Sequence, residues 1–282
     1  MRNTLVDALD HQPHPQRREL DLALAKAARN GLSDAARELI AQGARGMTDC
    51  GDGMTALMLA ASLPNADCVK LLLPVSDPLA QDRVSGRTPL MIAALHGRFS
   101  SVEALLPVSN PREKDRAGDT ALIFAAGNGR LDVLELLLPV SDAAKRNATH
   151  FDALACAVAS TGPDIVQCAR LLAPLCDARR SPGNWTPLMT AAHRGNVEIA
   201  QILIPHSDVE AALPDGATAL SLALRLGHAE CARAILDAIQ EKAAQTESLE
   251  LRAALSPANL ATACATEDGA QSAPASRKPR VL

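Results

Sequence analysis

The sequence predicts an all-α fold, a solenoid of stacked helix-turn-helix units with short β-hairpin-like tips. Three observations lead to this prediction: the composition, an internal period, and the placement of Pro and Gly within that period. Of the 282 residues, 48% are hydrophobic but only 1% are aromatic. A core of Ala, Leu, Val and Ile favours close-packed helices over sheets, which are enriched in aromatic and β-branched residues. All-β folds are therefore disfavoured.

One short pattern recurs along the chain at intervals of 32 to 34 residues. In most copies a residue that can cap a helix is followed by Ala or Pro, then by Leu, and, after two further residues, by a pair of small residues. The copies begin at Leu22, Thr55, Thr88, Thr120, Asp152, Thr186 and Thr218. A second pattern, a Leu-rich stretch with a Pro, follows in five of them from Leu71, Leu105, Leu136, Leu171 and Leu203. Two patterns in phase predict two helices in every repeat.

The repeat around Thr88 shows how each element is expected to form. Gly86 suits a tight turn with positive φ, Thr88 caps the inner helix through its hydroxyl, and Pro89 takes the first helical position. Gly97 ends this helix, and an outer helix runs back to Pro107, because the residue before a proline avoids the α region. Each repeat leaves an apolar face that only the next repeat can cover, so the units are expected to stack.

This pattern of T-P-L-x-x-A-A, a Gly and a Leu pair resembles the ankyrin repeat. The resemblance covers residues 20 to 245 in seven copies, which start near residues 20, 53, 86, 118, 150, 184 and 216. The sequence departs from the family at two places. The His that follows T-P-L is replaced by Met58, Met91, Ile123, Ala155, Met189 and Ser221, and the Lys-x-Gly-Ala after the Leu pair mostly becomes Pro-Val-Ser. The resemblance implies a fold that binds partners through its hairpin tips and inner helices.

The flanking segments divide the chain into three parts. Residues 1–19 are expected to be a flexible arm, and residues 20–247 the repeat domain. Residues 248–282 are expected to hold the remnant of a capping helix and a disordered tail, because the tail has too few large apolar residues to fold alone.

Charge and patterning exclude several classes of partner. The chain has 28 Lys and Arg against 32 Asp and Glu, a net charge of −4, so the basic footprint of a nucleic-acid-binding protein is missing. No apolar run approaches the roughly 18 residues of a membrane span, and the N-terminus does not resemble a signal peptide. Seven scattered cysteines suit a reducing compartment. We expect a monomeric, cytoplasmic protein that binds another protein, and neither nucleic acid nor a membrane.

No arrangement of residues indicates catalysis, a metal or a cofactor. The glycines around Asn128 and Asp52 fall at helix connections and tips, not in a phosphate-binding loop between strand and helix. His96, His193 and His228 recur at turns of separate repeats, and spaced ligands of this kind are not typical of a structural metal site. Two alternatives stay open: a metal- or redox-sensing cluster of Cys156, Cys168 and Cys176, and a phosphorylation ladder of Ser76, Ser109, Ser141 and Ser207.

The candidate binding site is the groove formed by the tips and inner helices. Its candidate residues are Arg87, His96, Arg116, Asp119, Asn128, Phe151, Trp185, His193, Arg194 and Arg225. Phe151 and Trp185 occupy the same tip position in adjacent repeats, and exposed aromatic residues beside Arg are typical of interface hot spots. The alternative is that both rings pack onto their own repeats, whereas Phe99 and Phe124 have clear packing positions.

The fifth repeat departs from the pattern at three points. His150 stands where other repeats have Gly, Asp152 replaces the capping Thr, and Ser160–Asp164 carries about three extra residues. Both His and Asp suit these positions, because His tolerates positive φ and Asp caps helices.

The leading hypothesis is a non-catalytic scaffold, adaptor or inhibitor that binds a protein in this groove. An effector that acts inside another (host) cell through the same groove is the alternative.

Overall fold

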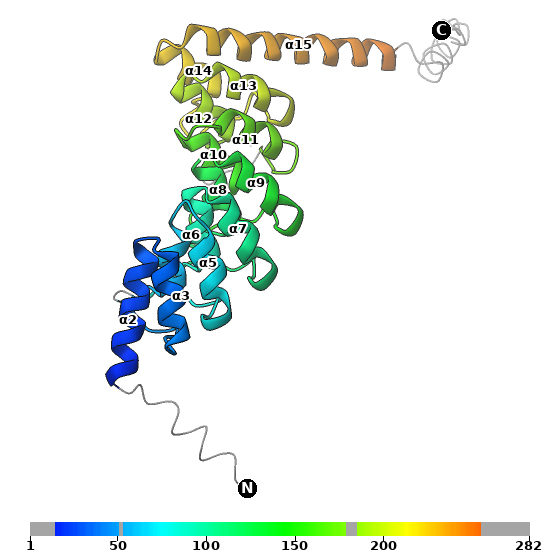
Figure 1. The fold of residues 1–282 in the computed structure, drawn as a ribbon. Coiled ribbons are helices and arrows are strands. Elements are labelled where there is room, and N and C mark those ends of the chain that lie inside the picture. The colour runs from blue at the N-terminus through cyan, green and yellow to red at the C-terminus, as the bar shows by residue number, and fades with distance from the viewer. Residues whose placement is uncertain (1–14, 51–52, 179–184, 255–282) are drawn as a thin grey trace, which may run out of the picture.

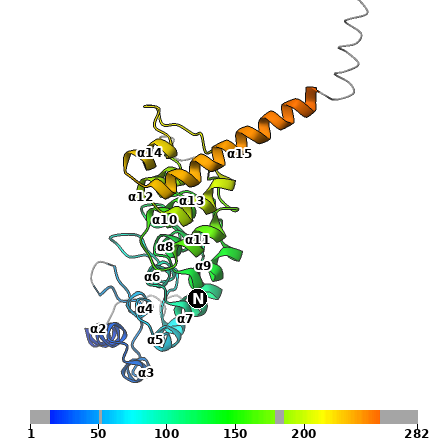
Figure 2. The same cartoon turned by 90° about the horizontal axis from the view of Figure 1, so that it is seen from above.

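The computed structural model describes residues 15–50, 53–178 and 185–254. Its helices form two layers that run side by side along the whole stack (Figure 1). Seen from above, helices α4, α6, α8, α10, α12 and α14 line one side, and their partners line the other (Figure 2). We call these the inner and outer helices.

Seven helical pairs follow one another within the described residues, as the repeat pattern predicts. The inner helices hold the capped pattern and the outer helices hold the Leu-rich pattern. The pairs are α2 Pro15–Arg29 with α3 Ser33–Ala41, α4 Ala56–Ala61 with α5 Asp67–Leu72, α6 Pro89–His96 with α7 Phe99–Leu105, α8 Ala121–Gly127 with α9 Leu131–Leu137, α10 Ala153–Ala159 with α11 Ile165–Leu172, α12 Pro187–Arg194 with α13 Val197–Leu203, and α14 Ala219–Arg225 with α15 Ala229–Ala254.

The inner helices begin at the predicted caps. The side-chain oxygen of the capping residue accepts a hydrogen bond from the backbone N–H three residues later, and this satisfies one donor of the first turn. The same bond recurs at Thr55, Thr88, Thr120, Asp152, Thr186 and Thr218. Asp152 therefore replaces the hydroxyl cap without loss of the helix start. Gly97 ends α6 in the left-handed conformation with φ 67°, as predicted.

The outer helices do not simply stop at proline. In four repeats the α-helix passes into one turn of 3₁₀-helix that contains the proline: Leu73–Val75, Leu106–Val108, Leu138–Val140 and Ile204–His206. Proline is compatible with the first positions of such a turn, because these N–H groups have no intrahelical acceptor. A Ser in extended conformation then follows, at Ser76, Ser109, Ser141 and Ser207.

The tips are hairpin-like turns, and among the described residues the ladder pairing is limited to one isolated bridge between Ala212 and Thr218. In five tips a backbone N–H donates across the turn with N···O distances of 2.9 to 3.0 Å, from Cys50 to Met54, Asp82 to Arg87, Asp115 to Asp119, Asn147 to Phe151, and Leu213 to Ala217. Successive tips are also joined, since Arg116 N–H donates to Ser85 O and Ala148 N–H to Ala117 O.

His150 is the one non-glycine residue with positive φ in the described part of the chain, at 65°. It occupies the tip position that Gly86, Gly118 and Gly216 fill with φ values of 75° to 80°. The sequence-based expectation that His takes the left-handed conformation here is confirmed.

The core runs continuously through the stack, because each helix packs against its equivalent in the next repeat. The Leu after the capped pair is buried to within 1% of full burial in α4, α6, α8, α10 and α12: Leu57, Leu90, Leu122, Leu154 and Leu188. The Ala pairs beside them are equally buried, and their small size lets neighbouring helices approach closely. This packing accounts for a core with almost no aromatic residues.

The ends of the domain differ from the predicted boundaries. Helix α2 begins at Pro15, inside the segment expected to be a flexible arm, and α15 continues for 26 residues to Ala254. Figures 1 and 2 show α15 extending well beyond the stack. Lys242 holds it to the preceding loop, with Nζ 2.6 Å from Glu210 Oε2. The expectations for residues 1–14 and 255–282 lie outside the described residues. In the described part, no helix combines the length and apolarity needed to cross a bilayer.

Candidate protein-binding surface

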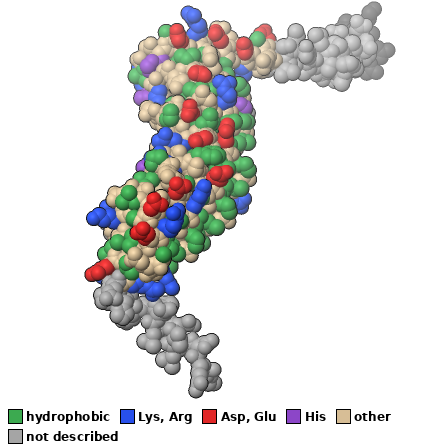
Figure 3. All heavy atoms as spheres, in the orientation of Figure 1, with side chains coloured by type: hydrophobic (Ala, Val, Ile, Leu, Met, Phe, Trp, Pro, Cys, Tyr) green, Lys and Arg blue, Asp and Glu red, His purple; other side chains and the backbone are tan. Residues whose placement is uncertain are grey.

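We use "inner face" for the surface made by the inner helices and the adjoining tips, which carries the ten candidate residues. Six of them use their side chains in specific contacts between or within repeats, and the other four are exposed. Figure 3 shows acidic and basic side chains interspersed with apolar ones over one face of the molecule, without a large field of one sign.

Arg87 is fixed between two repeats. Its guanidinium carbon lies 4.8 Å from the centre of the Phe124 ring, which belongs to the next inner helix. Its Nε lies 3.7 Å from Oδ2 of Asp115, a carboxylate that is almost fully buried. A cation over a ring face is attracted by the ring quadrupole, so Arg87 stabilises this junction. The side chain is still 35% exposed and accessible to a partner.

Asp119 and Asn128 are also held by neighbours. Asn147 Nδ2 of the next tip donates to Asp119 Oδ1 at 2.7 Å. Burial raises the pKa of Asp119, although the bond from Asn147 acts in the opposite direction. The Asn128 amide donates to Phe124 O at 2.8 Å and so satisfies a carbonyl at the end of α8. Both residues therefore have structural partners.

Trp185 lies over the inner helix of its own repeat. Its Nε1 donates to Thr190 Oγ1 at 2.9 Å, and its ring meets the His193 ring edge-on with centroids 5.9 Å apart. The ring is half-buried against the core. Since this indole already has a hydrogen-bond acceptor, it offers a partner mainly its apolar surface.

Phe151 projects from a rigid tip. Its side chain is 36% exposed, while its backbone N–H donates to Asn147 Oδ1 and its carbonyl accepts from Asn147 N–H, both at 2.9 Å. Among the described residues the close ring pair is Trp185 with His193, so the Phe151 and Trp185 rings do not stack on one another. Phe124 is buried as expected, but Phe99, for which a packing position was expected, is 40% exposed on the outer helix α7.

The remaining candidates lie at the ends of inner helices or at a tip. Arg194 reaches back to the preceding repeat and donates to Ser160 O at 2.7 Å and to Ala159 O. His96, Arg116 and Arg225 have exposed side chains. Partial desolvation, together with the positive charges of Arg98, Arg130 and Arg87, lowers the pKa of His96. Arg87 belongs to the tip of the same repeat, and Arg98 and Arg130 follow the inner helices α6 and α8.

A set of contacts at these helix ends was not found from the sequence. Arg98 Nε donates to Ser62 O of the preceding repeat at 2.9 Å, and His228 Nε2 lies 3.2 Å from His193 O. A Cβ added at Gly97 would lie 2.6 Å from Arg130 Cδ, so the arginine crosses directly over the glycine. The sequence does place basic residues at matching positions after several inner helices. It does not show that their side chains point toward the neighbouring repeat.

The pKa shifts of the fifth-repeat cysteines disfavour the thiolate. Burial, together with neighbouring carboxylates, raises the pKa of Cys156 and Cys176 to about 12 and that of Cys168 to about 11. A reactive cysteine needs the opposite shift, toward the thiolate. Within the described residues, no three His, Cys, Asp or Glu side chains are placed to hold a metal ion. These observations favour packing over the sensing alternative.

The stacked helical pairs and the hydrogen-bonded tips define a repeat protein. Every repeat contributes part of its accessible surface. Family models for ankyrin repeats match residues 24–115 and 167–246, and a single-repeat model matches residues 117–150. The chain belongs to the ankyrin-repeat family. The unmatched residues 151–166 coincide with the irregular first half of the fifth repeat.

The fold is similar to that of the human ASB11 ankyrin repeat domain, seen in a crystal structure. The TM-score is 0.66 and the identity 24%, over 76% of this chain and 96% of that one. Comparison with curated proteins found no match. Ankyrin repeats are in general a non-enzymatic module for binding other proteins.

Proposed function

We propose that the protein is a non-catalytic scaffold, adaptor or inhibitor that binds a protein partner on its inner face, with Phe151 as the central anchor and Trp185 beside it. The observation that carries the proposal is the exposed Phe151 ring on a tip whose backbone is fixed by Asn147. A ring that is already ordered loses little conformational freedom when a partner covers it, so most of its burial contributes to affinity.

The neighbouring contacts support this placement. Asn147 also donates to Asp119 of the preceding tip, so two tips are held in one arrangement. Trp185 presents an apolar ring surface whose polar atom already has an acceptor, and a partner covers it without leaving an unsatisfied donor. Arg87 remains partly exposed one junction away and supplies a positive charge at the edge.

The test compares Phe151→Ala with Phe99→Ala, a matched control in which the exposed ring lies on the outer helix α7. Partners captured by the wild type are identified by mass spectrometry, and the affinity of each is then measured with purified protein. We expect Phe151→Ala to weaken binding by about 2 kcal/mol, or roughly 30-fold, and Phe99→Ala to leave it unchanged. Loss of binding in Phe99→Ala alone would place the interface on the outer layer and refute the proposal.

A further inference from the structure

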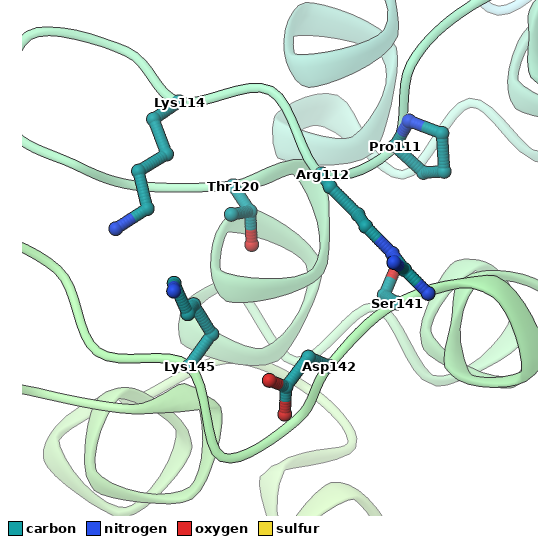
Figure 4. A pocket seen from close by; sticks show the side chains of 7 residues that line it. All are labelled: Pro111, Arg112, Lys114, Thr120, Ser141, Asp142 and Lys145. Atoms are coloured by element: carbon teal, nitrogen blue, oxygen red, sulfur yellow. The ribbon is translucent and has the colours of Figure 1, made fainter.

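A second surface feature lies between the loops that follow two successive outer helices and adjoins the start of inner helix α8 at Thr120. Pro111, Arg112 and Lys114 from one loop, and Ser141, Asp142 and Lys145 from the next, surround a hollow of about 660 Å³ beside Thr120. Figure 4 shows the basic side chains of both loops arranged around this space. Three cations and one carboxylate leave the lining with a net charge of two positive, in a chain whose net charge is −4.

The combination of Arg112 and Lys145 is specific to this junction. Repeats place equivalent residues in equivalent loops, so a side chain needed for folding recurs from repeat to repeat. The position of Arg112 is filled by Leu79 in the preceding repeat and Glu210 in the last, and the position of Lys145 by Ala80 and Ala211. The fifth repeat has Arg179 and Arg180 at these two positions, but the partner positions in the neighbouring loops hold Ala211 and Ala144, so the pair of cations does not recur. The stack therefore forms without these charges, and their presence here needs another reason.

The carboxylate of the hollow, by contrast, belongs to the fold. Asp142 Oδ1 accepts a hydrogen bond from the N–H two residues later, at 3.1 Å. The same turn recurs at Asp77, Asn110 and Asp208. Asp142 is thus a turn-forming residue that happens to line the hollow, and it is already engaged with the backbone.

Lys114 has a structural role as well. Its Nζ donates to Arg146 O at 3.2 Å, which parallels the bond from Gln81 Nε2 to Lys114 O in the preceding repeat. Neither the Arg112 guanidinium nor the Lys145 ammonium has such a bond within the described residues, and both side chains are exposed. Arg112 and Lys145 are therefore the two cations available to a ligand.

We propose that this hollow binds a phosphorylated side chain of a protein partner. A phosphate monoester carries a charge of about −1.5 to −2 at neutral pH, which matches the net charge of the lining. Arg112 supplies the planar fork that binds two phosphate oxygens, and Lys145 and Lys114 supply compact positive charges from the opposite side. A carboxylate would neutralise only half of the lining charge. None of the lining residues is among the ten candidate residues of the inner face, so the proposed site does not depend on Phe151.

The probe is a fluorescent pool of short peptides with one fixed phosphoserine, compared with the same pools carrying Ser or Glu at that position. We expect the phosphoserine pool to bind at concentrations at least about tenfold lower than the other two, because each charge-assisted hydrogen bond contributes substantially. The double variant Arg112→Ala with Lys145→Ala should abolish this preference. The matched control, Lys70→Ala with Arg233→Ala, removes two exposed cations of the outer helices and should retain it.

Circular dichroism establishes that each variant is folded. Equal binding of the Glu and phosphoserine pools would assign the hollow to carboxylates and overturn the proposal, as would an unchanged preference in the Arg112 and Lys145 double variant. Phe151→Ala should bind the phosphoserine pool as the wild type does. If Phe151→Ala did not bind the phosphoserine pool, the hollow and the inner face would be one site, and the proposal of a second site would be overturned. If Phe151 proved not to anchor a partner, the result with the phosphoserine pool would not change.

Discussion

The tip glycine Gly118 should tolerate no side chain, and Gly118→Ala provides a sharp test of how the tips are packed. Its φ is 79°, and an added Cβ would lie 2.7 Å from the backbone nitrogen of Ala148. That nitrogen donates to Ala117 O at 2.8 Å, so it cannot move without breaking the bond between two tips. The left-handed conformation costs Ala about 1–2 kcal/mol. The lost hydrogen bond adds about 1 kcal/mol, and crowding adds at least as much again.

We therefore expect Gly118→Ala to reduce the free energy of unfolding by about 2–4 kcal/mol, after the smaller entropy of the unfolded Ala chain is allowed for. The matched control is Gly127→Ala, in the same repeat but at the end of helix α8, where the added Cβ would meet Cys156 Cβ at an ordinary 3.6 Å. That change should be neutral or stabilise by up to about 1 kcal/mol. Urea unfolding followed by circular dichroism measures both. A cost below about 0.5 kcal/mol for Gly118→Ala, or a larger cost for Gly127→Ala, would refute the reasoning.

Three other predictions concern single side chains. His150→Gly should raise the free energy of unfolding by about 0.5 kcal/mol, because relief of left-handed strain exceeds the added chain entropy, and a fall in the urea midpoint would contradict this. Cys156, whose pKa is raised to about 12, should react with a thiol reagent at pH 8 only after denaturation, and rapid labelling of the native protein would show that the thiol is not buried. His96, whose pKa is lowered from 6.5, should titrate by NMR below that value, and Arg130→Ala should move the midpoint upward. Since the unfolded chain binds this proton more readily, His96 makes the fold less stable as the pH falls below 6.5.

Local signals made the repeat architecture predictable. The cap at Thr88, the left-handed Gly97 and the substitution of His150 for Gly each depend on a residue and its near neighbours, and each is found as expected. The length of the last helix was not predictable in the same way, because it depends on the absence of a residue that would end the helix. Residues 229–254 hold neither Gly nor Pro, so nothing ends α15 where proline ends the outer helices of earlier repeats.

Side-chain contacts across the junctions between repeats could not be predicted from the sequence. Arg87 lies over Phe124, a residue 37 positions later, because the rotation between neighbouring repeats brings that ring beneath the tip. Trp185 turns onto Thr190, five residues along, because a hydroxyl within reach of its indole N–H satisfies that donor. A local sequence pattern predicts neither the rotation between neighbouring repeats nor the rotamer of a side chain. Six of the ten candidate residues therefore have structural partners for their side chains: Arg87, Asp119, Asn128, Trp185, His193 and Arg194.

Polar side chains that recur at equivalent positions of successive repeats are attributed to the fold, and those that do not recur are candidates for a function. The hydroxyl oxygens of Ser76, Ser109, Ser141 and Ser207 are buried and lack a hydrogen-bond partner within the described residues. Because all four follow the same 3₁₀ turn while the charges of the adjoining loops differ, these hydroxyls report the shared turn geometry and not a ligand. A kinase would also have to open the turn to reach them, which argues against a phosphorylation ladder. The pair of Arg112 and Lys145 across one junction does not recur at the junctions before and after it, and the proposed phosphate site rests on this observation.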